Sequence, residues 1–178
     1  MVSTGLQRTS INDQSVQLGD GGTGLTLDIQ AYQGFKSFTV YGSGSYLLNP
    51  KVNNGVATGR SRPSEAIMSV ADSYLYRGGI IAPTPKFHAL VWSFGIRGEG
   101  VPVRDLIGKS TDFRRPGMSI AIDPGLVYSH GKDQWSFNVP VAMYRNRPRS
   151  VSDILVGNSG GDAAFADQSL IFGYQRRF

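Results

Sequence analysis

Cysteine is absent from the 178 residues of the chain, which excludes a disulfide scaffold, a thiolate metal site and a cysteine nucleophile. Charged residues make up only 17% of the sequence, whereas about a quarter is usual in soluble proteins. No uninterrupted apolar run approaches the ~18 to 20 residues of a membrane-spanning helix. A helical membrane protein is therefore excluded, and the shortage of charge must have another cause.

The sequence is rich instead in segments where apolar and polar residues alternate. Trp135, Phe137 and Val139, for example, have one parity, and Ser136 and Asn138 have the other. This period of two residues is typical of β-strands with two different faces. No segment of any length shows the period of an amphipathic helix. Strands are predicted over residues 23–32, 38–46, 69–82, 88–99, 118–129, 135–144 and 167–178.

The connections between these strands alternate between short and long. Short turns are predicted at 33–36, 83–86 and 130–133, and long polar connections at 49–64, 103–116 and 147–165. The strands run to roughly 10 to 14 residues, longer than the ~5 to 6 of a soluble sandwich but matching tilted membrane-spanning strands. The pattern predicts an all-β protein: one domain over 1–178, folded as an antiparallel up-and-down transmembrane β-barrel.

The end of the sequence carries an amphipathic segment that finishes on an aromatic residue. Its apolar side chains share one face: Leu170, Phe172, Tyr174 and Phe178. The segment resembles the assembly signal of bacterial outer-membrane β-barrels. That resemblance implies the barrel-assembly machinery as a partner and the outer membrane of a Gram-negative bacterium as the location.

Four further stretches look like a transporter family of outer-membrane barrels associated with phenol meta-degradation pathways. They are GDGG at 19–22, SGSYLLNP at 43–50, FRRPG at 113–117 and GDAAFAD at 161–167. The resemblance spans nearly the whole chain. It implies a β-barrel that passes small solutes, hydrophobic ones among them, and it supplies no catalytic residues.

The number of predicted strands is odd, whereas bacterial single-chain barrels have an even number. Residues 1–18 show only weak alternation. Either they contain an irregular first strand, which makes eight, or they are the remnant of a loop or strand of a larger barrel.

Polar and charged side chains gather on the parity that would face the barrel interior. The candidates for lining a pore are Asp28, Arg77, Arg97, Glu99, Asp123 and Asn138. One hypothesis is a pore in which these charges set solute preference. The other is a ladder of charges that plugs a narrow barrel, because side chains fill the interior of an eight-stranded one.

Arginine is concentrated near the predicted long connections, and the net charge is +5. Guanidinium groups bind phosphate in a bidentate manner, so lipopolysaccharide is a candidate partner. The candidate contacts are Arg114, Arg115, Arg145 and Arg147. The alternative is a solvated loop surface. Nucleic acid is not predicted, since the aromatic residues alternate along the apolar face and do not line a basic groove.

Catalysis and cofactors are not predicted. Ser129 and His130 are sequence neighbours, which places their side chains on opposite faces of a strand. Asp28, Glu99 and Asp123 would form a carboxylate site only if the strand register brought them together, and ion pairs with Arg77 and Arg97 are favoured instead. No metal-ligand spacing is present.

The sequence therefore predicts a channel or porin-like passive transporter of small solutes, which is not an enzyme. Two alternatives remain. One is a non-conducting barrel that binds lipopolysaccharide or a partner. The other is a soluble lipocalin-like carrier, in which Leu25, Phe94 and Phe137 would point inward.

Overall fold

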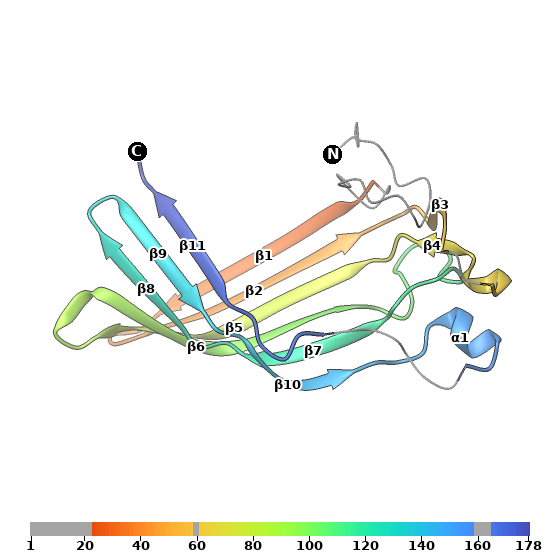
Figure 1. Cartoon of the computed structure of the whole chain (residues 1–178). Helices are drawn as coiled ribbons and strands as arrows, with labels where there is room; N and C mark the ends of the chain where they lie inside the picture. Colours follow the sequence, from red (N-terminus) through yellow and green to blue (C-terminus); the bar gives the residue numbers. More distant parts are fainter. Residues whose placement is uncertain (1–22, 59–60, 159–164) are drawn as a thin grey trace.

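Long antiparallel strands make up most of the computed structural model, which describes residues 23–58, 61–158 and 165–178 (Figure 1). Nine strands form the main sheet: β1 (Leu25–Gly34), β2 (Thr39–Leu48), β5 (Ser73–Thr84), β6 (Phe87–Val101), β7 (Gly117–Ile122), β8 (Gly125–His130), β9 (Asp133–Asn138), β10 (Val141–Asn146) and β11 (Ile171–Arg176). Every pairing in this sheet is antiparallel.

Two of the predicted strands are each broken in the middle by a proline. β7 and β8 both pair with β6 and are separated by Asp123 and Pro124, while β10 pairs with β7 and β9 with β8. Pro140 separates β9 from β10 in the same way. Proline has no N–H for the ladder, so the strand bends there. Each of the seven predicted segments thus contains one strand or one broken strand.

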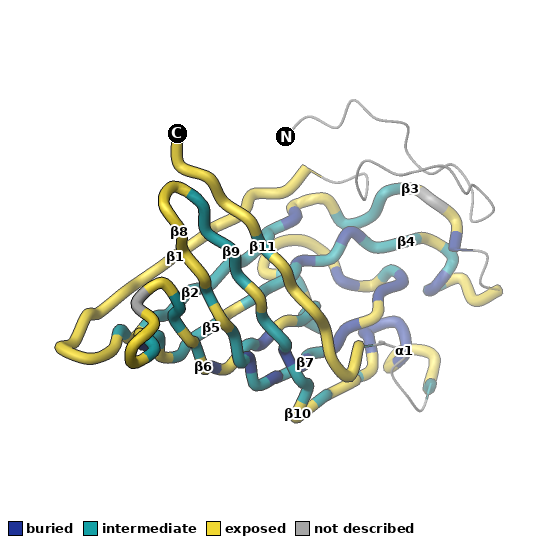
Figure 2. The backbone as a smooth tube through the Cα atoms, turned by 60° about the vertical axis from the view of Figure 1, so that its left-hand side comes forward, coloured by how far each residue is buried: buried dark blue, intermediate teal, exposed yellow. Residues whose placement is uncertain are grey.

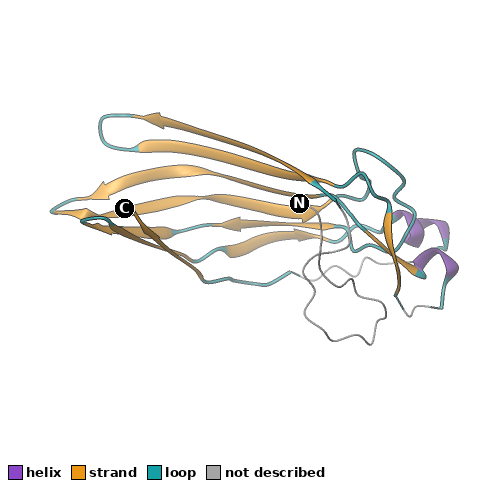
Figure 3. Cartoon of the chain, turned by 90° about the horizontal axis from the view of Figure 1, so that it is seen from above, coloured by secondary structure: helices purple, strands orange, loops and turns teal. Residues whose placement is uncertain are grey.

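The sheet curls into a half-barrel (Figure 3). At Gly79 and Gly95 two neighbouring backbones come very close on one face: a Cβ added at Gly79 would lie 2.6 Å from the Cα of Gly95. Only glycine permits that approach. Within the described residues, β1 is one edge of the sheet, and the other edge is β11 in the turn half and β10 in the loop half; neither pairs with β1. The coarse prediction of an all-β antiparallel meander is therefore confirmed.

The register separates the side chains of the sheet into two faces. One set of cross-strand rows carries Asp28, Ser45, Leu75, Glu99, Ser119 and Arg145, and beside them Gln30, Ser43, Arg77, Arg97 and Ala121. We call this polar side the concave face. The opposite rows carry Leu27, Ile29, Tyr76, Ile80, Phe94, Ile96, Ile120, Leu126, Phe137 and Phe172. This apolar side is the convex face.

The two ends of the half-barrel are built differently. At the turn end, β1–β2, β5–β6 and β8–β9 are joined by short turns, as predicted, and Phe35 stacks on Phe38 in the first of them. At the loop end, the connections predicted to be irregular contain a small hairpin and two helical turns. These are β3 (Asn53–Ala57), the 3₁₀ turn η1 (Pro63–Glu65), β4 (Ile67–Ser69) and α1 (Val151–Leu155). Figure 2 shows that many of the buried positions lie at this loop end.

The sequence analysis missed these short elements, which are stabilised both by local capping and by contacts between distant parts of the chain. α1 begins at a capping box, in which the Ser150 hydroxyl accepts from Asp153 N and the Asp153 carboxylate accepts from Ser150 N. Five residues are too few to form a helix on propensity alone. No helix in the described part of the chain is long and apolar enough to cross a membrane.

Candidate functional site

The concave face brings the six predicted pore-lining residues to one side of the sheet. Asp28 and Glu99 lie in one cross-strand row, and Arg77 is directly opposite Arg97 in the next. Asn138 follows two rows further toward the turn end, opposite Gly125. Two arginines placed opposite each other repel unless each has its own counter-ion.

Arg77 finds its counter-ion at the break between β7 and β8. Its guanidinium lies 2.6 Å from an Asp123 carboxylate oxygen, and the Asp123 side chain is buried. Asn138 Nδ2 donates to the other Asp123 oxygen at 3.1 Å. The Arg77 guanidinium also lies 6.0 Å from the Tyr41 ring centroid, within cation–π range. Because an unpaired buried carboxylate is costly, these contacts hold the concave side of the bend together.

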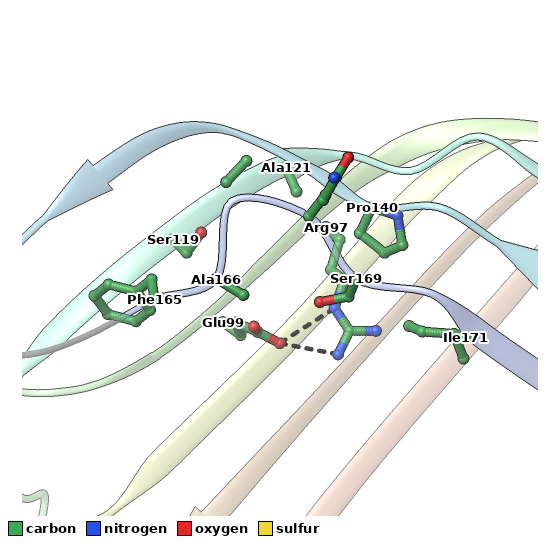
Figure 4. Close-up of a pocket in the computed structure, with 11 residues that line it drawn as sticks. Arg97, Glu99, Ser119, Ala121, Pro140, Phe165, Ala166, Ser169 and Ile171 are labelled. Atoms are coloured by element: carbon green, nitrogen blue, oxygen red, sulfur yellow. Dashed lines mark hydrogen bonds and ion pairs between the residues drawn. The ribbon is translucent and has the colours of Figure 1, made fainter.

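Arg97 is paired along its own strand with Glu99. Its Nε and Nη2 donate to Glu99 Oε2 at 3.2 and 2.9 Å. Both side chains remain partly exposed on the concave face, at 20% and 47%. Beside them is a cavity of about 60 Å³, which is lined also by Ser119, Ala121, Pro140, Phe165, Ser169 and Ile171 (Figure 4).

The three acidic candidates do not form a carboxylate pair. Asp28 and Glu99 share a row, but β2 and β5 lie between them. Asp123 is engaged by Arg77, and Glu99 by Arg97. The structure therefore favours the ion pairs over the catalytic arrangement. No group of three or more His, Asp or Glu side chains that could hold a metal occurs in 23–58, 61–158 or 165–178.

The candidate lipopolysaccharide contact Arg114 is a buried structural residue, so its proposed exposure was wrong. Its side chain is 1% exposed, and Nη1 donates to Asp105 Oδ1 at 2.7 Å while Nη2 donates to Ser69 Oγ. Burial by itself would raise the pKa of Asp105. The hydrogen bonds and charge of Arg114 outweigh that effect and hold the Asp105 pKa below its ordinary value.

The remaining arginine candidates lie in two different places. Arg145 lies near the end of β10, opposite Ser119 on the concave face, and pairs with Asp167. Arg115 and Arg147 are exposed at the loop end, as expected. Arg60, another arginine of the predicted connection 49–64, lies outside the described residues.

Asp72 is the centre of the loop network, and the sequence analysis did not single it out. Its buried carboxylate accepts from Tyr46 Oη at 2.8 Å, Asn49 N at 2.7 Å and Leu106 N at 3.0 Å. Its own N–H donates to Asp105 Oδ1. Two long connections are thereby tied to the end of β2. An aspartate just before a strand gives no sequence signal of this role.

A second polar cluster joins α1 to the 3₁₀ turn. Asn158 Nδ2 donates to Asp153 Oδ1 and to Glu65 Oε1, and both carboxylates are buried. Burial would raise the pKa of Asp153, but hydrogen bonds from Asn158 and Ser150 lower it overall. This contact links positions 93 residues apart in the chain.

The residues of the predicted assembly signal lie at the end of the sheet. Phe172 and Tyr174 occupy convex rows of β11, opposite Phe137 and Trp135. Leu170, Phe172, Tyr174 and Phe178 are all exposed. Three aromatic residues of adjacent strands stack near the turn end: Tyr128 on Trp135 at 5.7 Å between ring centroids, and Trp135 on Tyr174 at 5.7 Å.

No family model, no curated protein and no solved structure matches the chain. The resemblance to the transporter family therefore rests on the four quoted motifs. Of these, 19–22 and part of 161–167 lie outside the described residues.

Proposed function

We propose that this half-barrel is part of a β-barrel in the outer membrane of a Gram-negative bacterium, through which small solutes diffuse passively. The observation that carries the proposal is the distribution of apolar side chains over the two faces. On the convex face Ile29 is 72% exposed, Phe172 68% and Ile96 53%. Apolar surface left in water costs about 25 cal/mol per Å², so a face of this kind is favourable against hydrocarbon.

A bilayer environment requires that the sheet be closed, because unpaired backbone groups in hydrocarbon cost several kcal/mol each. β1 runs from the loop end to the turn end, and β11 runs in the same direction from the middle of the sheet to the turn end. Antiparallel closure between two parallel-running edges takes an odd number of further strands. One strand would give the eight-stranded barrel of the sequence analysis, and a larger odd number would give the larger barrel.

In the proposed barrel, the short turns would lie on the periplasmic side and the loop end on the extracellular side. The stack of Tyr128, Trp135 and Tyr174 has the composition of an aromatic girdle and would lie at the periplasmic interface, near the short turns. Arg115 and Arg147 would contact lipopolysaccharide at the opposite end. The barrel-assembly machinery would recognise the terminal segment, and the transporter family of phenol meta-degradation pathways is the proposed relationship.

The experiment that tests this function begins with refolding, with and without detergent micelles. We expect a β-sheet spectrum and heat-dependent gel mobility only with detergent. Reconstitution into planar bilayers should then give discrete conductance steps. A monodisperse sheet protein that forms without detergent would overturn the membrane proposal and favour the soluble carrier.

A non-conducting barrel is the second candidate, and one observation favours it. The Arg77–Asp123–Asn138 cluster pairs opposite charges and occupies the bend on the concave face. In a narrow barrel such a cluster would fill the interior. Correct insertion without conductance would select this candidate.

A further inference from the structure

Phe165 is a large apolar side chain on a face that otherwise carries mostly small, polar and charged groups. Three phenylalanines within the strands, Phe94, Phe137 and Phe172, lie in rows of the convex face. Phe165 precedes β11 and lines the cavity on the concave side, beside Arg97 and Glu99 (Figure 4). The sequence analysis placed it in a connection and gave it no role.

Phe165 contributes to two neighbouring hollows of the concave face. The first is the cavity of about 60 Å³ beside Arg97. The second, of about 360 Å³, lies toward the loop end and is lined by Ser45, Leu47, Ser73, Leu75 and Val101. Phe165 and Glu99 line both hollows. A solute moving along this face from the loop end toward Arg97 would therefore pass these two side chains.

The backbone next to Phe165 is held in place by the sheet. Ala142 N donates to Asp167 O at 2.9 Å, and Ser169 N donates to Pro140 O at 3.0 Å. The Asp167 carboxylate also pairs with Arg145, which lies in the same concave row as Glu99. These contacts begin two residues after Phe165. The segment runs along β10 and presents the ring to the interior from a fixed anchor.

We propose that Phe165 is the constriction that determines the largest solute able to pass along the concave face. This inference rests on the proposed function, since it concerns the same passage. The aromatic ring narrows the interior from the segment beside β10, and Glu99 on β6 lines the same cavity. Hydrophobic constrictions of this kind control permeation by size and by exclusion of water.

The test compares Phe165→Ala with Phe94→Ala, because the two variants remove the same ring from opposite faces. Conductance in planar bilayers and liposome swelling with neutral sugars of increasing size are the readouts. We expect Phe165→Ala to raise the conductance and to shift the size limit to a larger sugar. Phe94→Ala should leave both unchanged. Heat-dependent gel mobility shows whether each variant has folded.

A third variant makes the test independent of whether Phe165→Ala folds. Phe165→Trp enlarges the ring and should lower the conductance and shift the size limit to a smaller sugar. If the wild type conducts and neither Phe165 variant differs from it, the inference is overturned and the proposed function stands. If no variant conducts, both are overturned. If Phe165→Ala conducts and the wild type does not, the Phe165 ring closes the passage completely, which would support the inference.

Discussion

The main sheet, which we call the wall, and the loop end of this protein distribute apolar and polar side chains in opposite ways. On the wall, large apolar side chains such as Ile29 and Phe172 are exposed on the convex face. At the loop end, the fully buried side chains include charged and hydroxyl groups such as Asp72 and Ser152. The comparison indicates that the two regions are adapted to different surroundings.

Several buried carboxylates of the loop end have their hydrogen-bond partners within the protein. Asp72 and Asp105 receive hydrogen bonds from backbone and side chains, and Arg114 neutralises Asp105. Water normally provides such partners for exposed loops. The wall, in contrast, has its backbone paired within the sheet, while many of its large apolar side chains are exposed. Soluble proteins usually bury large apolar side chains and leave charged ones exposed, which is the opposite of the distribution seen in these two regions.

The largest effect is expected from removing the charge that neutralises the loop end. Arg114→Ala leaves Asp105 buried without its cation, which costs about 3 to 5 kcal/mol for a buried pair. We expect proteolysis of the loops at 49–72 and 102–116 while the wall stays resistant. Limited proteolysis of the refolded protein measures this. Arg115→Ala, which alters an exposed neighbour, is the control, and equal sensitivity of both variants would contradict the prediction.

The wall can be tested by two adjacent residues of β1 that face opposite sides. Ile29→Lys places a charge on the convex face, which costs about 2 to 4 kcal/mol near the middle of a bilayer. Gln30→Lys places the same charge on the concave face and should have little effect. The folded fraction in lipid vesicles, titrated with urea, compares them. Equal destabilisation would mean that the two faces do not differ in environment.

The curl of the sheet brings the backbone of β5 at Gly79 very close to the backbone of β6 at Gly95. Gly79→Ala introduces a Cβ that meets the backbone of Phe94 and Gly95, and overpacking of this kind costs about 1 to 3 kcal/mol. Gly42→Ala is the matched control in the adjacent β2, where a Cβ would meet nothing within 4 Å. Urea unfolding of both variants in detergent measures the difference, and a similar midpoint for both would refute the prediction.

The sequence predicted the wall far better than the loop end, for a physical reason. Alternation along a strand such as 135–144 is a local signal, and it also assigned Asp28, Arg97 and Glu99 correctly to one face. The breaks at Pro124 and Pro140 were not predicted, although proline is the local signal that would have located them. The partners of Arg77 needed the register, since Asp123 lies two strands further along the sheet.

The loop end was predicted poorly because its contacts are distant in the chain. Arg114 and Arg115 are adjacent and identical in type, yet one is buried and the other exposed. Nothing in the local sequence distinguishes them, and the difference comes from where Asp105 and Ser69 lie. The sequence did not predict the partner of Arg145, because its pairing with Asp167 forms only when the segment before β11 runs along β10.

The smallest effect is expected from lowering the pH, which protonates the carboxylates of the loop end without removing Arg114. The pKa of Asp105 in the folded protein lies below 3.8, its value without these contacts. Between the two values the unfolded loop end binds more protons, so its stability is complete above pH 3.8 and falls as the pH decreases through the folded pKa. The pKa of Asp153 is lowered from the same value, so its contribution has the same sign. Amide hydrogen exchange, corrected for the intrinsic rate, should show loss of protection at Leu106, whose N–H donates to Asp72, before any loss in β5 and β6. Simultaneous loss in both regions would mean that the loop end and the wall unfold as one unit.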